Sequence, residues 1–143
     1  YWNNFLKEMK LRKGVLKTLK ELKKKGIKIV IISDLTTHIQ LRKLRHLKIN
    51  KHIDFLITSE EAGREKPHPS MFLLGLNKVK HLPEDAIMVG DSPKKDIEGA
   101  NSIGMTSVLI GKRIDAKEES LRKPNFYIKE IPEVLKVLDK LEK

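Results

Sequence analysis

Residues 87–96, Ile-Met-Val-Gly-Asp-Ser-Pro-Lys-Lys-Asp, combine an apolar segment with a glycine and two aspartates. The apolar run from Ala86 to Val89 predicts a short buried strand, and Gly90 after it allows the backbone or a ligand to approach closely. Ligands of open α/β sheets bind beyond the carboxyl ends of the strands. Asp91 and Asp96 at such an end would suit Mg²⁺, which prefers oxygen ligands and keeps several waters. The pattern fits equally well a turn in which Asp91 caps a helix and Asp96 lies on a solvated face.

Apolar runs alternate with amphipathic segments along the whole chain, which predicts a doubly wound, three-layer α/β fold with a parallel sheet. The β-branched run at residues 27–32 is typical of a strand buried on both faces. Residues 58–66 are expected to form a polar loop and residues 112–124 a surface excursion, so residues 1–143 form a single domain. We expect strands at residues 27–32, 54–57, 86–89, 106–110 and 126–128, and helices at 1–9, 15–25, 37–47, 69–79, 96–102 and 133–141.

The composition excludes several classes of protein. The 143 residues include 39% hydrophobic and 34% charged residues, which is typical of a globular domain with a charged surface. The absence of cysteine excludes disulfides, thiolate catalysis and cysteine-ligated zinc. No apolar run approaches the length of a membrane span, and no signal-peptide pattern is present. We therefore expect a cytoplasmic protein without a membrane partner.

The net charge of +11 is concentrated near the start of the chain, where ten basic and two acidic residues lie between Lys7 and Lys28. One interpretation is a surface for nucleic acid or another polyanion. The other is a solvated helix face, because the leucines of residues 15–25 fall on one side and most lysines on the other. No aromatic side chains are interleaved with the lysines, as stacking on bases would require. We favour the solvated face, and nucleic acid is not an expected partner.

Polar groups follow three of the predicted strands, all at the same edge of the sheet. Ser33 follows the first strand, Lys66 lies in the loop after the second, and Asp91 with Asp96 follows the third. A hydroxyl, an ammonium group and paired carboxylates are what phosphoryl transfer requires, because a metal and a cation neutralise the transferring group. Together they favour the metal interpretation of residues 87–96.

These motifs resemble those of the haloacid dehalogenase (HAD) superfamily across essentially the whole chain. Ile-Ile-Ser-Asp is similar to the second motif, which implies that Ser33 binds the phosphoryl group. Asp34, where many relatives have Asn, lies near the same edge and is a candidate substrate contact, although a helix-start or surface position is the favoured interpretation. Glu-Lys-Pro-His-Pro-Ser-Met-Phe is similar to the third motif, which implies that Lys66 stabilises an aspartyl-phosphate intermediate. Gly-Asp-Ser-Pro-Lys-Lys-Asp is similar to the fourth, which implies that Asp91 ligates Mg²⁺ and Asp96 supports the metal or its waters.

One part of the family pattern is missing. The family's nucleophile is the first Asp of an Asp-x-Asp motif that ends the central strand of the sheet, and these 143 residues contain no Asp-x-Asp. The resemblance places residues 1–13 at the end of the cap and its linker. It implies that the first strand, between those ending at Ser33 and Val89, comes from a missing segment or a second chain. Two interior strands would otherwise carry unpaired edges.

The resemblance therefore implies a Mg²⁺-dependent phosphatase for a small phosphorylated metabolite, and we expect this chain alone to be inactive. Relatives that cleave carbon–halogen bonds tend to lack the metal-binding acid, so the presence of Asp91 makes a 2-haloacid dehalogenase the less favoured enzyme. The alternative from a different class is a non-catalytic protein of the same fold that binds a polyanion through the face between Lys7 and Lys28.

Overall fold

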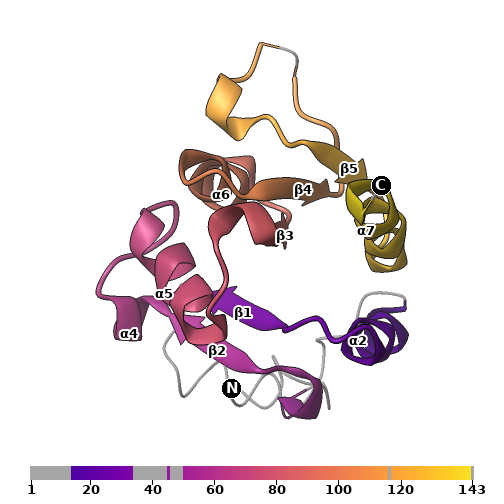
Figure 1. The fold of residues 1–143 in the computed structure, drawn as a ribbon. Coiled ribbons are helices and arrows are strands. Elements are labelled where there is room, and N and C mark those ends of the chain that lie inside the picture. The colour runs from indigo at the N-terminus through magenta and orange to yellow at the C-terminus, as the bar shows by residue number, and fades with distance from the viewer. Residues whose placement is uncertain (1–13, 34–44, 46–49, 116, 143) are drawn as a thin grey trace, which may run out of the picture.

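The computed structural model describes residues 14–33, 45, 50–115 and 117–142 (Figure 1). Asp34, the predicted helix at residues 1–9 and the proposed cap remnant at residues 1–13 therefore lie outside the described residues. The predicted helix at residues 37–47 also lies outside them, except for residue 45.

The strands form two parallel sheets. Strand β1 (Val30–Ser33) pairs with β2 (Phe55–Thr58), and β4 (Thr106–Ile110) lies between β3 (Ile87–Gly90) and β5 (Phe126–Ile128). All three pairings are parallel. The predicted parallel sheet is thus confirmed, but within the described part of the chain it is divided between β1 and β3.

Helices cover both faces, which confirms the three layers. Figure 1 shows α5 and α6 on one side of the strands and α2 and α7 on the other. The helices are α2 (Val15–Lys24), α4 (Ser59–Ala62), α5 (Pro69–Val79), α6 (Glu98–Ser102) and α7 (Val134–Glu142), with a π-helical turn at Pro93–Ile97 and 3-10 turns at Asn50–His52, Pro83–Asp85, Ser120–Arg122 and Ile131–Glu133.

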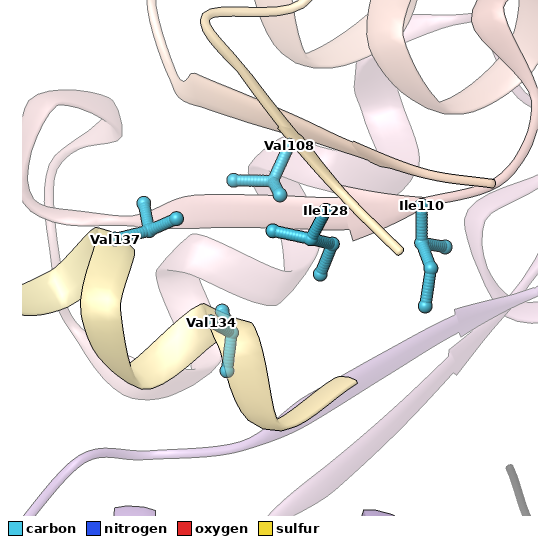
Figure 2. Close-up of a cluster of buried hydrophobic side chains, with 5 residues drawn as sticks. All are labelled: Val108, Ile110, Ile128, Val134 and Val137. Atoms are coloured by element: carbon cyan, nitrogen blue, oxygen red, sulfur yellow. The ribbon is translucent and has the colours of Figure 1, made fainter. Parts of the chain in front are cut away.

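Three hydrophobic clusters hold these layers together. In Figure 2, α7 packs on β4 and β5 through Val108, Ile110, Ile128, Val134 and Val137. A second cluster joins α2 to the β1–β2 sheet around Leu19 and Ile29. The third spans the division of the sheet, because Phe72 and Leu76 of α5 pack with Ala100 and Met105 and with partly buried Ile32 and Met88.

The observed element boundaries differ from the predicted ones in places. Helix α5 has the predicted bounds, with Pro69 in its first turn and the His68 Nδ1 atom accepting from the Ser70 N–H at 3.1 Å. Residues 58–66 are not only loop, because α4 begins after Thr58, whose hydroxyl accepts from the Glu61 N–H at 3.3 Å. Thr-x-x-Glu is a recognisable helix start that the prediction overlooked. The first strand is shorter than expected and spans Val30–Ser33.

Candidate active site

Lys66 joins the two halves of the sheet at the carboxyl ends of their strands. Its Nζ atom lies 2.7 Å from Asp96 Oδ1, after β3, and donates to the Ile32 carbonyl of β1 at 3.3 Å. Both charged side chains are largely buried, with 13% of Lys66 and 7% of Asp96 exposed. A buried ion pair adds little to the stability of the fold unless its geometry is good. Removing one partner is nevertheless destabilising, because it leaves the other charge buried and uncompensated. The ammonium group is therefore fixed between β1 and β3.

Asp96 is buried and does not lie on a solvated face. Its residue is 5% exposed, and Oδ2 accepts from the Ser92 N–H at 3.2 Å while Oδ1 binds Lys66. The cap of the following turn is Ser92, whose hydroxyl accepts from the Lys95 N–H at 3.1 Å, and not Asp91. The helix predicted from Asp96 consequently begins earlier, with a π-helical turn from Pro93. The cap-and-surface interpretation of residues 87–96 is wrong.

Gly90 is required for this arrangement. A Cβ atom at Gly90 would overlap the Asp96 carboxylate. The sequence predicted a close approach at Gly90 but not its partner, which turns out to be the side chain of Asp96. The glycine therefore lets the carboxylate lie against the end of β3.

Ser33 and Asp91 lie at the ends of the two strands that Lys66 joins. Ser33 is the last residue of β1, is half-buried, and pairs in register with the fully buried Thr58. Asp91 follows β3 directly and is exposed. The structure thus places four of the predicted site residues at one edge of the sheet, with Lys66 and Asp96 in direct contact. Asp34 is the predicted site residue outside the described part of the chain.

The carboxylates at this edge fit a magnesium ion in number and chemistry. Among the described residues no group of three or more His, Asp, Glu or Cys could hold a metal. Mg²⁺ needs fewer, since it is commonly bound through one or two carboxylates, waters and substrate phosphate. Asp91 is exposed, and Asp96 is buried with both carboxylate oxygens bound to protein groups. Metal binding by Asp91 and Asp96 stays a prediction.

A second Lys–Asp pair, which the sequence analysis missed, lies at the opposite ends of β1 and β2. Lys23 Nζ of α2 lies 2.7 Å from both oxygens of Asp54, and Asp54 Oδ2 accepts from the Ile29 N–H at 2.7 Å. Burial raises the pKa of Asp54, but the Lys23 and Ile29 hydrogen bonds and the charges of Lys23 and Lys28 outweigh it, so that this pKa is lowered. No local pattern signals such a pair, because its partners lie 31 residues apart.

The basic face of α2 is mostly solvated. Lys17, Lys20 and Lys24 are exposed, whereas Thr18 and Leu19 are buried. This arrangement agrees with the solvated-face interpretation, and polyanion binding is not tested by it. Within residues 14–142 where the structure is described, no helix is long and apolar enough to cross a membrane.

Comparisons with known proteins agree with the motifs at this edge. The family described as haloacid dehalogenase-like hydrolase matches residues 1–110. The chain is 43% identical over 120 residues to ribulose-1,5-bisphosphate 5-phosphatase of Halopiger xanaduensis, covering 84% of this chain and 48% of that protein. It is 36% identical over 129 residues to glyceraldehyde 3-phosphate phosphatase of Pyrococcus furiosus, covering 89% and 54%.

A solved structure of a HAD phosphatase also resembles this chain. The HAD phosphatase from Thermococcus onnurineus superposes with a TM-score of 0.80 at 29% sequence identity, covering 90% of this chain and 58% of that one. The chain spans about half the length of the curated relatives it matches.

Proposed function

Because this chain belongs to the haloacid dehalogenase-like hydrolase family, we propose that it forms most of the catalytic core of a Mg²⁺-dependent phosphatase for a small phosphorylated metabolite. The observation that carries the proposal is the position of Lys66, which is held between Asp96 and the Ile32 carbonyl where β1 and β3 end. A buried ammonium group at this edge, beside a hydroxyl and two carboxylates, is suited to stabilising charge on a phosphoryl group.

Each residue has a separate task in this proposal. The Ser33 hydroxyl donates to one phosphoryl oxygen and Lys66 neutralises another. Asp96 orients the Lys66 ammonium group through the 2.7 Å contact. Asp91, supported by Asp96, would hold Mg²⁺, which supplies further neutralisation of the phosphate when bound. The attacking carboxylate comes from polypeptide outside these 143 residues, and we place the enzyme in the cytoplasm.

The relatives favour a class of substrate. Both named phosphatases act on phosphorylated sugars, ribulose-1,5-bisphosphate in one and glyceraldehyde 3-phosphate in the other. We propose a substrate of the same class, a short-chain sugar phosphate.

The test uses a longer form of the protein, in which this chain is joined to a segment that restores the length of its curated relatives. Hydrolysis of p-nitrophenyl phosphate is measured with and without MgCl₂, in the unaltered protein and in Asp91→Asn. We expect Asp91→Asn to lower the Mg²⁺-dependent rate by about 100-fold or more, because losing several kcal/mol of charge stabilisation has that effect. Asp139→Asn on the exposed face of α7 is the matched control and should leave the rate unchanged.

Two outcomes would contradict the proposal. Undiminished turnover in Asp91→Asn would remove the metal assignment. Chloride release from 2-chloropropionate without Mg²⁺, together with no phosphatase activity, would favour the dehalogenase instead.

A further inference from the structure

Basic residues follow two neighbouring strands at the edge of the sheet that carries the candidate active site. Lys112 and Arg113 come just after β4, and Lys129 comes directly after β5. All three residues are exposed, and together they are called the β4–β5 patch below. Because β4 and β5 are parallel to β3, the patch lies at the same edge as Asp91, the edge at which α/β sheets bind ligands.

Arg113 lies on the same face of the sheet as Asp96. Its guanidinium group lies over the Tyr127 ring, 4.4 Å from the ring centroid. Tyr127 is in register with Leu109 of β4, which is itself in register with Gly90 of β3. At Gly90 the Asp96 carboxylate occupies the place of a side chain. In-register residues of parallel strands point to one face, and two strand spacings put Tyr127 about 10 Å from Gly90.

Arg113 differs from Arg122, the other arginine between β4 and β5. Arg122 is surrounded by carboxylates, since its side chain lies 3.0 Å from Glu98, 3.5 Å from Glu118 and 3.8 Å from Glu119. Arg113 forms no ion pair with any residue that the structure describes, and its contact is the aromatic ring. The charge of Arg122 is therefore neutralised within the protein, whereas that of Arg113 is not.

The acidic residues next to the patch in the sequence bind backbone amides. Asp115 Oδ1 accepts from the Lys117 N–H at 2.9 Å, and Glu133 Oε2 accepts from the Lys129 N–H at 2.6 Å. Glu130 and Glu133 form a capping box in the turn before α7. In the part of the chain that the structure describes, none of these carboxylates forms an ion pair with a member of the patch.

An arginine that lies over an aromatic ring keeps its N–H groups for an anion. The ring contacts the face of the planar guanidinium group, whereas the N–H bonds leave that group in its own plane. The forked arrangement of these donors matches a phosphate or carboxylate, which it binds through two hydrogen bonds. Holding the side chain on the ring also lowers the entropic cost of binding. Arg113 is thus positioned to bind an anion with little rearrangement.

We propose that the β4–β5 patch is a second anion-binding site, at which Arg113 binds a phosphate or carboxylate group and Lys112 and Lys129 add electrostatic attraction. The anion is either the far end of the substrate, whose scissile phosphoryl group lies at the end of β3, or a separate anion. The first source rests on the proposed function, whereas the existence of the site does not.

The first experiment measures anion binding without turnover. The longer form of the protein, without Mg²⁺, is titrated with inorganic phosphate at constant ionic strength, and the arginine Nε–Hε resonances are followed by NMR. We expect the Arg113 resonance to shift and to saturate. The Arg122 resonance should stay in place, because Arg122 Nε already donates to Glu98 at 3.0 Å. An Arg113 shift that does not saturate, or equal shifts at both arginines, overturns the proposal.

Two pairs of variants test how the site is built. Tyr127→Leu should weaken phosphate binding by about threefold, because the ring no longer holds Arg113, and Tyr127→Phe should keep the affinity. Lys112→Met should also weaken binding by about threefold. Lys123→Met is its control, since it removes an exposed charge just before the amino end of β5, away from the patch. Equal losses in the two lysine variants would reflect net charge alone and would overturn the proposal.

The second experiment identifies the source of the anion. Values of kcat/KM are measured for ribulose 1,5-bisphosphate, the substrate named for one relative, and for p-nitrophenyl phosphate, which has a single phosphate. If the substrate supplies the anion, Arg113→Met should lower the ratio of the two values by about tenfold or more, and Lys123→Met should leave it unchanged.

An unchanged ratio in Arg113→Met, together with saturable phosphate binding at Arg113 in the unaltered protein, assigns the site to a separate anion. Absence of phosphatase activity with that binding retained contradicts the proposed function and leaves the anion site standing. Absence of saturable binding at Arg113 in a protein that hydrolyses p-nitrophenyl phosphate overturns the anion site alone.

Discussion

Two Lys–Asp pairs lie at opposite ends of the strands, and each has the same 2.7 Å contact. Lys23–Asp54 fastens α2 to the start of β2 and leaves 33% and 19% of its side chains exposed. Lys66–Asp96 joins the ends of β1 and β3 and is exposed to 13% and 7%. The first pair stays within one half of the sheet, whereas the second connects the two halves.

The location of each ion pair on the sheet, and not the pair itself, determines its role. Asp54 binds Lys23 and accepts from the Ile29 N–H, so it holds α2 against the amino ends of β1 and β2. Asp96 instead fixes an ammonium group at the edge of the sheet where β1 ends at Ser33 and Asp91 follows β3, the edge at which α/β sheets bind ligands. We therefore expect one pair to affect stability alone and the other to affect both stability and turnover.

Removing Lys66 should produce the largest effect. In Lys66→Met the free energy of unfolding should fall by about 3–5 kcal/mol, because Asp96 is left buried and unpaired. In the longer form of the protein, turnover of p-nitrophenyl phosphate should fall by about 100-fold or more. Urea unfolding and steady-state kinetics measure the two effects.

A double variant distinguishes these two effects. Lys66→Met with Asp96→Asn removes both charges, so stability should recover in part while turnover stays low. Recovery of turnover in the double variant would contradict the assigned role of Lys66.

Gly90→Ala should have the second largest effect, a loss of about 1–3 kcal/mol in the free energy of unfolding. The added methyl group meets the Asp96 carboxylate and forces it away from Lys66. Gly75→Ala is the control, because a Cβ there would lie 3.4 Å from Val30 Cγ1, an ordinary contact, within helix α5. Thermal unfolding should show Gly75→Ala neutral or stabilised, since alanine favours helix interiors. Equal destabilisation of both variants would refute the specific overlap at Gly90.

Asp54→Asn should cost about 1 kcal/mol at neutral pH, because it removes a hydrogen-bonded charge that is partly exposed. Turnover in the longer form should not change. The lowered pKa of Asp54 gives this loss a pH dependence. The stabilisation is present above the ordinary aspartate pKa of about 4 and is lost as the pH falls through the lower folded-state pKa. Urea unfolding should therefore show that the free energies of unfolding of the unaltered protein and Asp54→Asn differ less in acid than at pH 7. A difference that stays constant with pH would contradict a lowered pKa for Asp54.

The exposed pair Lys78–Glu61 should show the smallest effect. Its atoms lie 3.3 Å apart, and both side chains are about 40% exposed. Lys78→Gln should change the free energy of unfolding by less than about 0.5 kcal/mol, as solvent screens the pair. A loss of stability as large as that in Asp54→Asn would indicate that solvent exposure does not determine how much each ion pair stabilises the fold.

Local patterns predicted the elements better than the contacts between them. The bounds of α5 were predicted because Pro69 marks its first turn, and the strand at Thr106–Ile110 was predicted where three aliphatic residues end a β-prone stretch. The start of the turn after β3 was misplaced because Asp96 was taken as its beginning, whereas Ser92 caps it and Pro93 opens it. Ser-Pro at that point was a signal that could have been used.

The sequence predicted where the candidate site residues lie on the sheet, but not the contacts between them. Ser33, Lys66, Asp91 and Asp96 could be assigned to one edge because parallel strands end together. The contact between Lys66 and Asp96 spans 30 residues and depends on how α5 and the turn at Pro93–Ile97 pack, which no periodicity reports. The burial of Asp96 was missed for the same reason.

The contact between Gly14 and Pro132 has a consequence for the order of folding. Gly14 precedes α2 with a left-handed backbone, and a Cβ there would overlap the Pro132 ring in the turn before α7. These residues lie near opposite ends of the described sequence, so their contact closes a very long loop. Contacts of this range carry a high entropic cost and form slowly. We expect the β1–β2 and β3–β5 units to assemble separately, and the packing of α2 against the last turn to complete the fold.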